Sequence, residues 1–278
     1  MMSNAVASKP VATGTEPIVI VDRPQAGVAL ITLNRPSARN ALSLEMIGEL
    51  HATIDRLGAD TTLSAIVLAA NGPVFSSGHD LKELTAHRSD GDAGLAFYTH
   101  TMTACSEMMQ AIVACPKPVI AAVHGTATAA GCQLVATCDL AVASQDAKFC
   151  TPGVNIGLFC STPMVALSRN LSHKHALEFL LSGDLFSAAD AARVGLINRA
   201  VPEAELDRTV DELARKIASK SPLTLAVGKE AFYRQAELSL DEAYAYTADV
   251  MVKNLEAADA KEGINAFVEK RTPVWCGR

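Results

Sequence analysis

Two short, wholly apolar stretches most constrain what this chain can fold into. Ala65–Ala70 (AIVLAA) and Val119–Val123 (VIAAV) contain no polar residue. Both are far shorter than the roughly 20 residues that span a membrane, and neither alternates with polar residues as a half-exposed strand does. They are typical of strands buried on both faces, as in a parallel sheet covered by helices. The sequence therefore predicts an α/β fold.

The segments around these stretches predict further strands and helices. Ile18–Val21 and Val28–Leu33 favour a hairpin, because a turn containing glycine separates them. Ser43 suits the N-cap of a helix that ends near Gly58. From about residue 94 to residue 114, apolar residues recur every three or four positions, which predicts a longer helix with one apolar face.

The last 75 residues or so have a different, all-helical pattern. Ser239 and Glu242 have the spacing of a capping box that opens a helix. An earlier helix is predicted by apolar residues at helical spacing, namely Leu206, Val210, Leu213 and Ile217. We therefore expect a disordered tail over residues 1–17, an α/β core over 18–203, and a helical region over 204–278. The apolar faces of that region must pack on the core or on another subunit.

Composition excludes several classes of partner. The net charge is −6 and no stretch is rich in Lys or Arg, so we expect neither a nucleic acid nor a membrane as partner. Residues 1–17 contain one Lys, no Arg and no apolar segment, which favours a cytoplasmic protein. The seven cysteines are odd in number and show no CxxC pair, so reduced and mostly buried thiols are expected. His173 and His175 have no visible third ligand, and we expect no metal.

Two turns built from small residues are the main candidates for a site. Ser76–Asp80 and Ala127–Gly131 each follow a predicted buried strand and precede a helix. Small side chains let a ligand approach the main chain, and the N–H groups of a first helical turn have no acceptor within the helix. Two such N–H groups aimed at one point would bind an oxyanion. The alternative is that both turns are tight corners whose small residues serve packing alone.

A series of motifs is similar to those of a known family. The segments are Leu33–Pro36 with Asn40–Leu42, Phe75–Lys82, Pro118–Gly125, Ala130–Gln133 with Cys138–Asp139, and Phe267–Arg271. In order and spacing this series resembles the crotonase (enoyl-CoA hydratase/isomerase) superfamily, over about residues 18–275. The runs SSGHDLKEL and ATAAGCQLVA resemble its enoyl-CoA hydratase domain-containing branch.

The resemblance implies a fold, a ligand and the residues that bind it. The fold would be a spiral of repeated ββα units, with a helical C-terminal region that forms a trimer or a dimer of trimers. The ligand would be an acyl-CoA thioester, as substrate rather than as a resident cofactor. The backbone N–H groups of His79 and Ala130 would hold its carbonyl oxygen. The positions that would contact CoA are Ser37, Ala38, Arg39, Ser77, His79, Asp80, Leu81, Phe267 and Lys270, the last two from a neighbouring subunit.

The chain departs from the family at the positions that would move protons. Hydration needs one group to take a proton from water and another to deliver one to carbon. In the family's hydratases two glutamates do so, and they match Gln133 and Gly153 here. A third acidic position, used in dienoyl isomerases, matches Ser161. A glutamine side chain cannot accept a proton at neutral pH, and glycine has no side chain. Ordinary hydratase chemistry is therefore not expected.

Several functions remain open on the sequence. One is an acyl-CoA enzyme that stabilises an enolate for hydrolysis, decarboxylation or isomerisation. A second is an enoyl-CoA hydratase of weak activity, which would be a lyase of fatty-acid metabolism. Similarity to the family would give the chain this name. A third is an inactive acyl-CoA binder or partner subunit. The thiols of Cys150 and Cys160 and the hydroxyl of Ser161 could act as nucleophiles beside a base, although buried structural roles suit the cysteines better.

Overall fold

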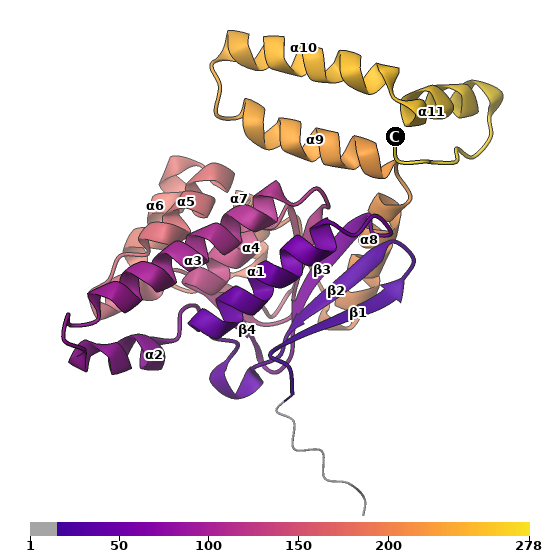
Figure 1. The fold of residues 1–278 in the computed structure, drawn as a ribbon. Helices are drawn as coiled ribbons and strands as arrows, with labels where there is room; N and C mark the ends of the chain where they lie inside the picture. The colour runs from indigo at the N-terminus through magenta and orange to yellow at the C-terminus, as the bar shows by residue number, and fades with distance from the viewer. Residues whose placement is uncertain (1–15) are drawn as a thin grey trace, which may run out of the picture.

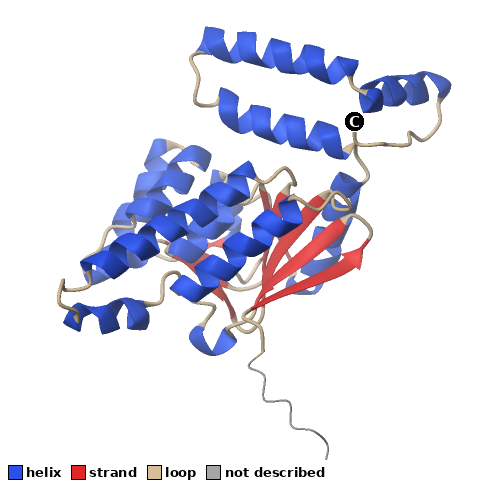
Figure 2. Cartoon of the chain, viewed as in Figure 1, coloured by secondary structure: helices blue, strands red, loops and turns tan. Residues whose placement is uncertain are grey.

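Two β-sheets form the centre of the structure, a computed structural model that describes residues 16–278 (Figures 1 and 2). One sheet has six strands in the order β1-β2-β3-β5-β7-β10, and the other has four in the order β4-β6-β8-β9. The strands are β1 Val19–Gln25, β2 Val28–Leu33, β3 Ala65–Ala70, β4 Val74–Ser76, β5 Val119–Val123, β6 Thr126–Thr128, β7 Leu140–Ser144, β8 Lys148–Cys150, β9 Phe186–Ser187 and β10 Arg199–Val201. Most of the tail expected at 1–17 lies outside the described residues.

Helices cover the sheets and form the C-terminal region (Figure 2). They are α1 Leu44–Gly58, α2 Leu81–Ala86, α3 Leu95–Ala114, α4 Ala130–Thr137, α5 Ser161–Asn170, α6 His173–Ser182, α7 Ala188–Val194, α8 Leu206–Ala218, α9 Pro222–Gln235, α10 Leu240–Glu256 and α11 Ala258–Glu269. Within the described residues, no helix combines the length and apolarity that crossing a bilayer requires.

The central strands form a ββ unit three times, which confirms the expected spiral. In each unit the first strand enters the large sheet and the second enters the small one: β3 with β4, β5 with β6, and β7 with β8. All these strands pair in parallel with their counterparts in the neighbouring units. A helix follows each unit, α2, α4 or α5. These helices therefore all begin on the side of the small sheet where the parallel strands β4, β6 and β8 end.

The local signals of the sequence are confirmed where they rest on capping and periodicity. Ser43 caps α1 by accepting a hydrogen bond from the N–H of Met46. Ser239 and Glu242 form a complete capping box at the start of α10. The apolar stretches at 65–70 and 119–123 are β3 and β5, and most of their residues are fully buried.

Other elements differ from the expectation. The first strand extends to Gln25 through a bulge, so the hairpin turn is shorter than the sequence suggested. The last strand of the large sheet, β10, covers only the three residues Arg199–Val201. Before it, the two-residue strand β9 pairs antiparallel with β8 and has no signal in the sequence. Such a short strand depends on its partner and not on its own composition.

The C-terminal helices fall into two groups. α8 packs across the large sheet, where Leu206, Val210 and Ala214 form a buried cluster with residues of the strands. α9, α10 and α11 stand away from the sheets (Figure 1). They expose large apolar side chains, among them Phe232, Leu240, Tyr244, Met251, Val252, Phe267 and Val268. This is the surface on which the expected contact between subunits would form.

A buried ion pair joins α9 to the core. The Lys229 ammonium donates to a carboxylate oxygen of Asp139 at 2.7 Å and to the carbonyl oxygens of Ile112 and Lys117 at 2.8 and 3.1 Å. Asp139 also accepts from the Tyr233 hydroxyl at 2.9 Å and from the Val119 N–H at 2.7 Å. Every ammonium proton therefore has an acceptor. The arrangement fixes α9 relative to the start of β5.

We predict that Lys229→Met lowers the free energy of unfolding by about 3–5 kcal/mol, because it leaves the Asp139 carboxylate without its cation. Thermal denaturation measures the loss. The double variant Lys229→Met/Asp139→Asn should lose less than the two single variants together, since no uncompensated charge remains. Lys253→Met on exposed α10 is the matched control. A Lys229→Met protein as stable as this control would contradict the role of the ion pair.

Candidate active site

The two turns expected from the sequence lie against each other. Gly78, in the turn after β4, has a φ of +82°, and a Cβ atom there would lie 2.9 Å from the Ala129 side chain and 3.0 Å from the Ala130 nitrogen. No other residue type fits this contact without displacing the main chain. Because β4 and β6 are parallel neighbours, the turns that follow them leave the sheet at the same edge. The structure thus brings the two segments together.

Each turn presents a backbone N–H group that has no acceptor in the part of the chain that the structure describes. Leu42 donates to the Gly78 carbonyl at 2.8 Å and accepts from the Asp80 N–H at 3.3 Å, which leaves the His79 N–H between them unused. Ala130 is the first residue of α4, so the helix offers its N–H no acceptor. Within residues 16–278, neither of the two N–H groups donates a hydrogen bond.

The backbone of Ala129 is held in an unusual conformation, with φ 50° and ψ −120°. A side chain makes this region unfavourable by roughly 1–3 kcal/mol, and such conformations persist only where the surroundings enforce them. Here the Ala129 N–H donates to the Cys150 carbonyl at 2.9 Å, and the Ala129 carbonyl accepts from the Gln133 N–H at 3.0 Å. These two bonds fix the peptide groups on either side of Ala129. The second of these groups contains the Ala130 N–H, so its direction is fixed as well.

Neither position of a missing glutamate has a group that accepts a proton. The Gln133 side chain is only 4% exposed, and its Oε1 atom has no hydrogen-bond partner within the described residues. At Gly153, a Cβ atom would lie 2.8 Å from the Leu158 carbonyl oxygen and 2.9 Å from the Cys160 sulfur. The space for a side chain at 153 is therefore already filled.

The expected CoA contacts at 37–39 and 77–81 lie on two segments that a hydrogen bond joins. Ser37 and Ala38 belong to the short 3-10 helix Pro36–Ala38, and the carbonyl of Arg39 accepts from the Ser77 N–H at 3.1 Å. This bond joins the 37–39 segment directly to the first turn. Leu81 opens α2 beside that turn and is half exposed. The Arg39 side chain is exposed, as a partner for phosphate must be.

Asp80 has a structural role that the sequence did not reveal. Its carboxylate accepts from Arg35 at 2.8 Å and caps α2 through the N–H groups of Lys82 and Glu83. Burial alone would raise the pKa of Asp80, but these hydrogen bonds hold it below its ordinary value. The carboxylate is thus charged and fully engaged. Arg35, part of the motif Leu33–Pro36 but given no role by the sequence, joins this turn to the segment that follows β2.

Phe267 and Lys270 are not brought to the turns by their own chain. Both lie at the end of α11, in the part of the molecule far from α2 and β4 (Figure 1). The Phe267 side chain is 85% exposed. Their expected contact with CoA requires a second chain and stays a prediction.

Cysteine thiols near the turns are protonated. Burial is the main cause that raises the pKa of Cys132, Cys150 and Cys160, that of Cys150 to about 11. A protonated thiol is a poor nucleophile, which favours the structural reading of these residues. Ser161 directs its hydroxyl to the Phe159 carbonyl at 3.3 Å. The His124 imidazole contacts the Gly72 carbonyl at 2.6 Å, a structural contact outside the two turns.

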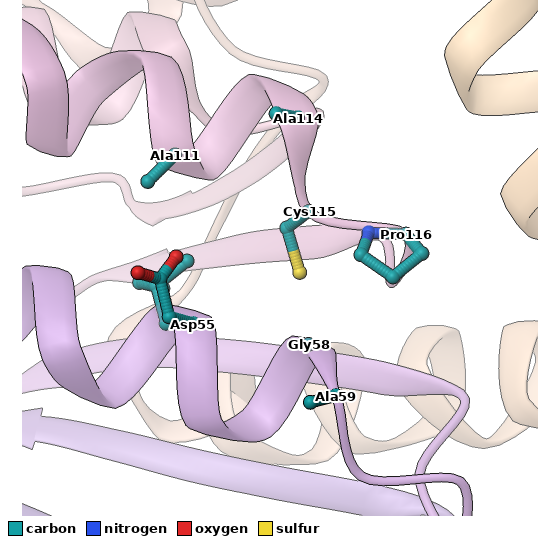
Figure 3. A pocket seen from close by; sticks show the side chains of 8 residues that line it. Asp55, Gly58, Ala59, Ala111, Ala114, Cys115 and Pro116 are labelled. Carbon is teal, nitrogen blue, oxygen red and sulfur yellow. The ribbon is translucent and has the colours of Figure 1, made fainter.

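The hollow drawn in Figure 3 is separate from the turns. It lies between the ends of α1 and α3, and its lining includes Gly58, Ala111 and Cys115. An adjoining hollow reaches α9 at Tyr233. Neither contains a residue of the two turns. Across residues 16–278, no three His, Cys, Asp or Glu side chains gather as a metal site would require.

Comparisons with known proteins agree with this geometry. The sequence matches the family described as enoyl-CoA hydratase/isomerase over residues 23–278. A mitochondrial enoyl-CoA hydratase domain-containing protein 3 of Rattus norvegicus is 48% identical over 97% of this chain and 88% of its own length. A probable enoyl-CoA hydratase of Bacillus subtilis is 35% identical over 90% of this chain and 95% of its own.

Solved structures give the same result. An enoyl-CoA hydratase of Mycobacterium smegmatis superposes with a TM-score of 0.89 at 48% identity, covering 94% of this chain and 99% of the other. The human enoyl-CoA hydratase domain-containing protein 3 superposes with a TM-score of 0.88 at 47% identity, covering 93% and 100%. The chain therefore belongs to the enoyl-CoA hydratase/isomerase (crotonase) family, in its enoyl-CoA hydratase domain-containing branch.

Proposed function

We propose that this chain binds an acyl-CoA thioester and stabilises its enolate in an oxyanion hole made by the N–H groups of His79 and Ala130. The observation that supports this most is the pair of unpaired N–H groups on two turns in direct contact. A thioester oxygen that gains negative charge would complete both hydrogen bonds. Each donor of this kind contributes roughly 10²–10³ in rate in well-studied enzymes.

The acyl-CoA would lie with its carbonyl at the two turns and its phosphates beyond the 37–39 segment. Arg39 and, from a second chain, Lys270 are the proposed cations for the phosphates. Two observations support the first assignment: the Arg39 side chain is exposed, and the Arg39 backbone carbonyl accepts from the Ser77 N–H. The second requires the proposed trimer or dimer of trimers, which the exposed apolar faces of α9–α11 support. Sedimentation of the purified protein tests it, and a monomer would contradict it.

Ordinary hydration is not the proposed reaction. Gln133 can orient a water molecule but cannot take its proton, and the space above Gly153 is filled by Leu158 and Cys160. Each missing acid or base removes roughly 10²–10⁴ in rate. Enolate chemistry without added water, such as isomerisation or decarboxylation, or hydrolysis of the thioester, remains within the proposal. The second candidate is an inactive acyl-CoA binder, which the absence of a glutamate at both 133 and 153 favours.

Three measurements on the purified protein separate these functions. Loss of the enoyl absorbance of crotonyl-CoA reports hydration, release of free thiol reports hydrolysis, and a raised melting temperature reports binding. Thiol release without hydration would support a hydrolase. Binding alone across a panel of acyl-CoAs would support the inactive binder. No binding to any of them would overturn the proposal.

The cytoplasm is a proposed location only. Residues 1–17 have the composition that suggested it, whereas several similar animal proteins have "mitochondrial" in their names and the Bacillus subtilis relative does not. Fractionation of cells that produce the chain tests the location.

We predict that an acyl-CoA binds more tightly than the matching S-alkyl-CoA thioether, which lacks only the carbonyl oxygen. Two hydrogen bonds of about 0.5–1.5 kcal/mol each correspond to roughly 5- to 150-fold in Kd. Calorimetry with butyryl-CoA and S-butyl-CoA measures the ratio, and the protein itself is unchanged in this comparison. Equal affinities would show that the two N–H groups do not hold the carbonyl.

We also predict that restoring both carboxylates does not create a hydratase. In Gln133→Glu/Gly153→Glu the new side chain at 153 meets the Leu158 carbonyl and the Cys160 sulfur, so the turn must shift. Overpacking of this kind costs about 1–3 kcal/mol. We expect a lower melting temperature and no gain in crotonyl-CoA hydration relative to Gln133→Glu alone. A stable double variant that hydrates crotonyl-CoA would contradict the packing argument.

A further inference from the structure

Two buried polar side-chain atoms at the candidate site have no hydrogen-bond partner within residues 16–278. Within residues 16–278, four buried side-chain polar atoms have no hydrogen-bond partner, and two of them are Nε2 of His79 and Oε1 of Gln133. Leaving such an atom unpaired costs about 1–3 kcal/mol, and each case in a native protein requires an explanation. His79 belongs to the first turn, and Gln133 lies in the first helical turn of α4, directly after the second. A polar ligand at the turns would explain both.

The His79 imidazole is the group at the turns that can exchange a proton near neutral pH. In the two turn segments, 76–80 and 127–131, the other titratable side chain is Asp80, which Arg35 and the start of α2 engage fully. Glu83, nearby on α2, is bound to the Leu44 N–H at 3.0 Å. Burial lowers the pKa of His79, so the ring is neutral at neutral pH and one of its nitrogens has a free lone pair.

We propose that the His79 imidazole is the base that moves a proton to and from the α-carbon of the bound acyl thioester. The proposal rests on the function proposed above and identifies the group that replaces the absent carboxylates. The backbone N–H of the same residue is one of the two oxyanion donors. A thioester carbonyl held there would therefore lie within one side-chain length of the ring. Nε2 is the buried edge of a half-buried ring, and it has no hydrogen-bond partner within the described residues.

The step balances without any further reactant. In the tautomer protonated at Nδ1, the Nε2 lone pair forms a bond to the α-proton, and the electrons of the broken C–H bond form the C=C bond of the enolate. The carbonyl π electrons move to the oxygen, where the His79 and Ala130 N–H groups hold the charge. Return of a proton from the imidazolium to the α-carbon restores the thioester. In D2O the returned nucleus is a deuteron once the imidazolium has exchanged with solvent.

Exchange of the α-protons of butyryl-CoA in D2O, followed by NMR, tests the proposal. We expect the wild-type protein to catalyse exchange and His79→Ala to lose it by at least about 100-fold, the smallest usual contribution of a general base. The Kd for butyryl-CoA should change less than the exchange rate, because His79→Ala retains the backbone N–H. His79→Gln, which keeps the volume of the side chain, should show the same loss. Added imidazole should restore part of the exchange in His79→Ala.

His100→Ala, on the exposed face of α3, is the matched control and should exchange like the wild type. Binding of butyryl-CoA without exchange by the wild type, or exchange retained in both His79 variants, would overturn the role of the imidazole and leave acyl-CoA binding intact. Failure of the wild type to bind butyryl-CoA would overturn this proposal together with the proposed function. The two failures are therefore distinguishable.

Discussion

The close approach of Gly78 to Ala129 and Ala130 is the contact on which the rest of the site depends. It places two helix-opening turns side by side, and each keeps one N–H group without an acceptor among the described residues 16–278. The parallel pairing of β4 with β6 makes the approach possible, and a Cβ atom at residue 78 would prevent it. The large sheet contributes by fixing the strands that precede β4 and β6. The fold thus converts two local turns into one non-local site.

Asn40 stabilises the loop next to the first turn. It is fully buried with a φ of 49°, and its side chain donates to the carbonyls of Asn71 and Val74 while it accepts from the Arg35 N–H. Its own carbonyl accepts from the Ser76 hydroxyl at 2.9 Å. A buried polar side chain with every group paired specifies one arrangement of the loop around it. The 35–42 segment is therefore rigid enough to hold the first turn in place.

Features that depend on neighbours in sequence could be predicted, and features that depend on neighbours in space could not. The buried strand at 119–123 and the Ser239 capping box follow from local patterns. The apolar stripe of α8 predicted a helix, but its packing on the large sheet depends on the fold. The two turns were recognisable as candidates, whereas their contact follows from strand order. That Cys160 fills the space above Gly153 has no local signal at all.

The candidate site contains features that cost folding free energy and that a protein without a ligand would not need. The Ala129 conformation and the two unpaired side-chain atoms each cost about 1–3 kcal/mol, a large share of the 5–15 kcal/mol by which proteins are usually stable. Glycine at 129 would remove the first cost, and apolar side chains at 79 and 133 would remove the others. A polar ligand bound at the two turns would supply hydrogen-bond partners to the two side-chain atoms and so offset part of this cost. An inactive binder needs the oxyanion contact alone, so the neutral imidazole of His79 is the feature that favours an enzyme over a binder.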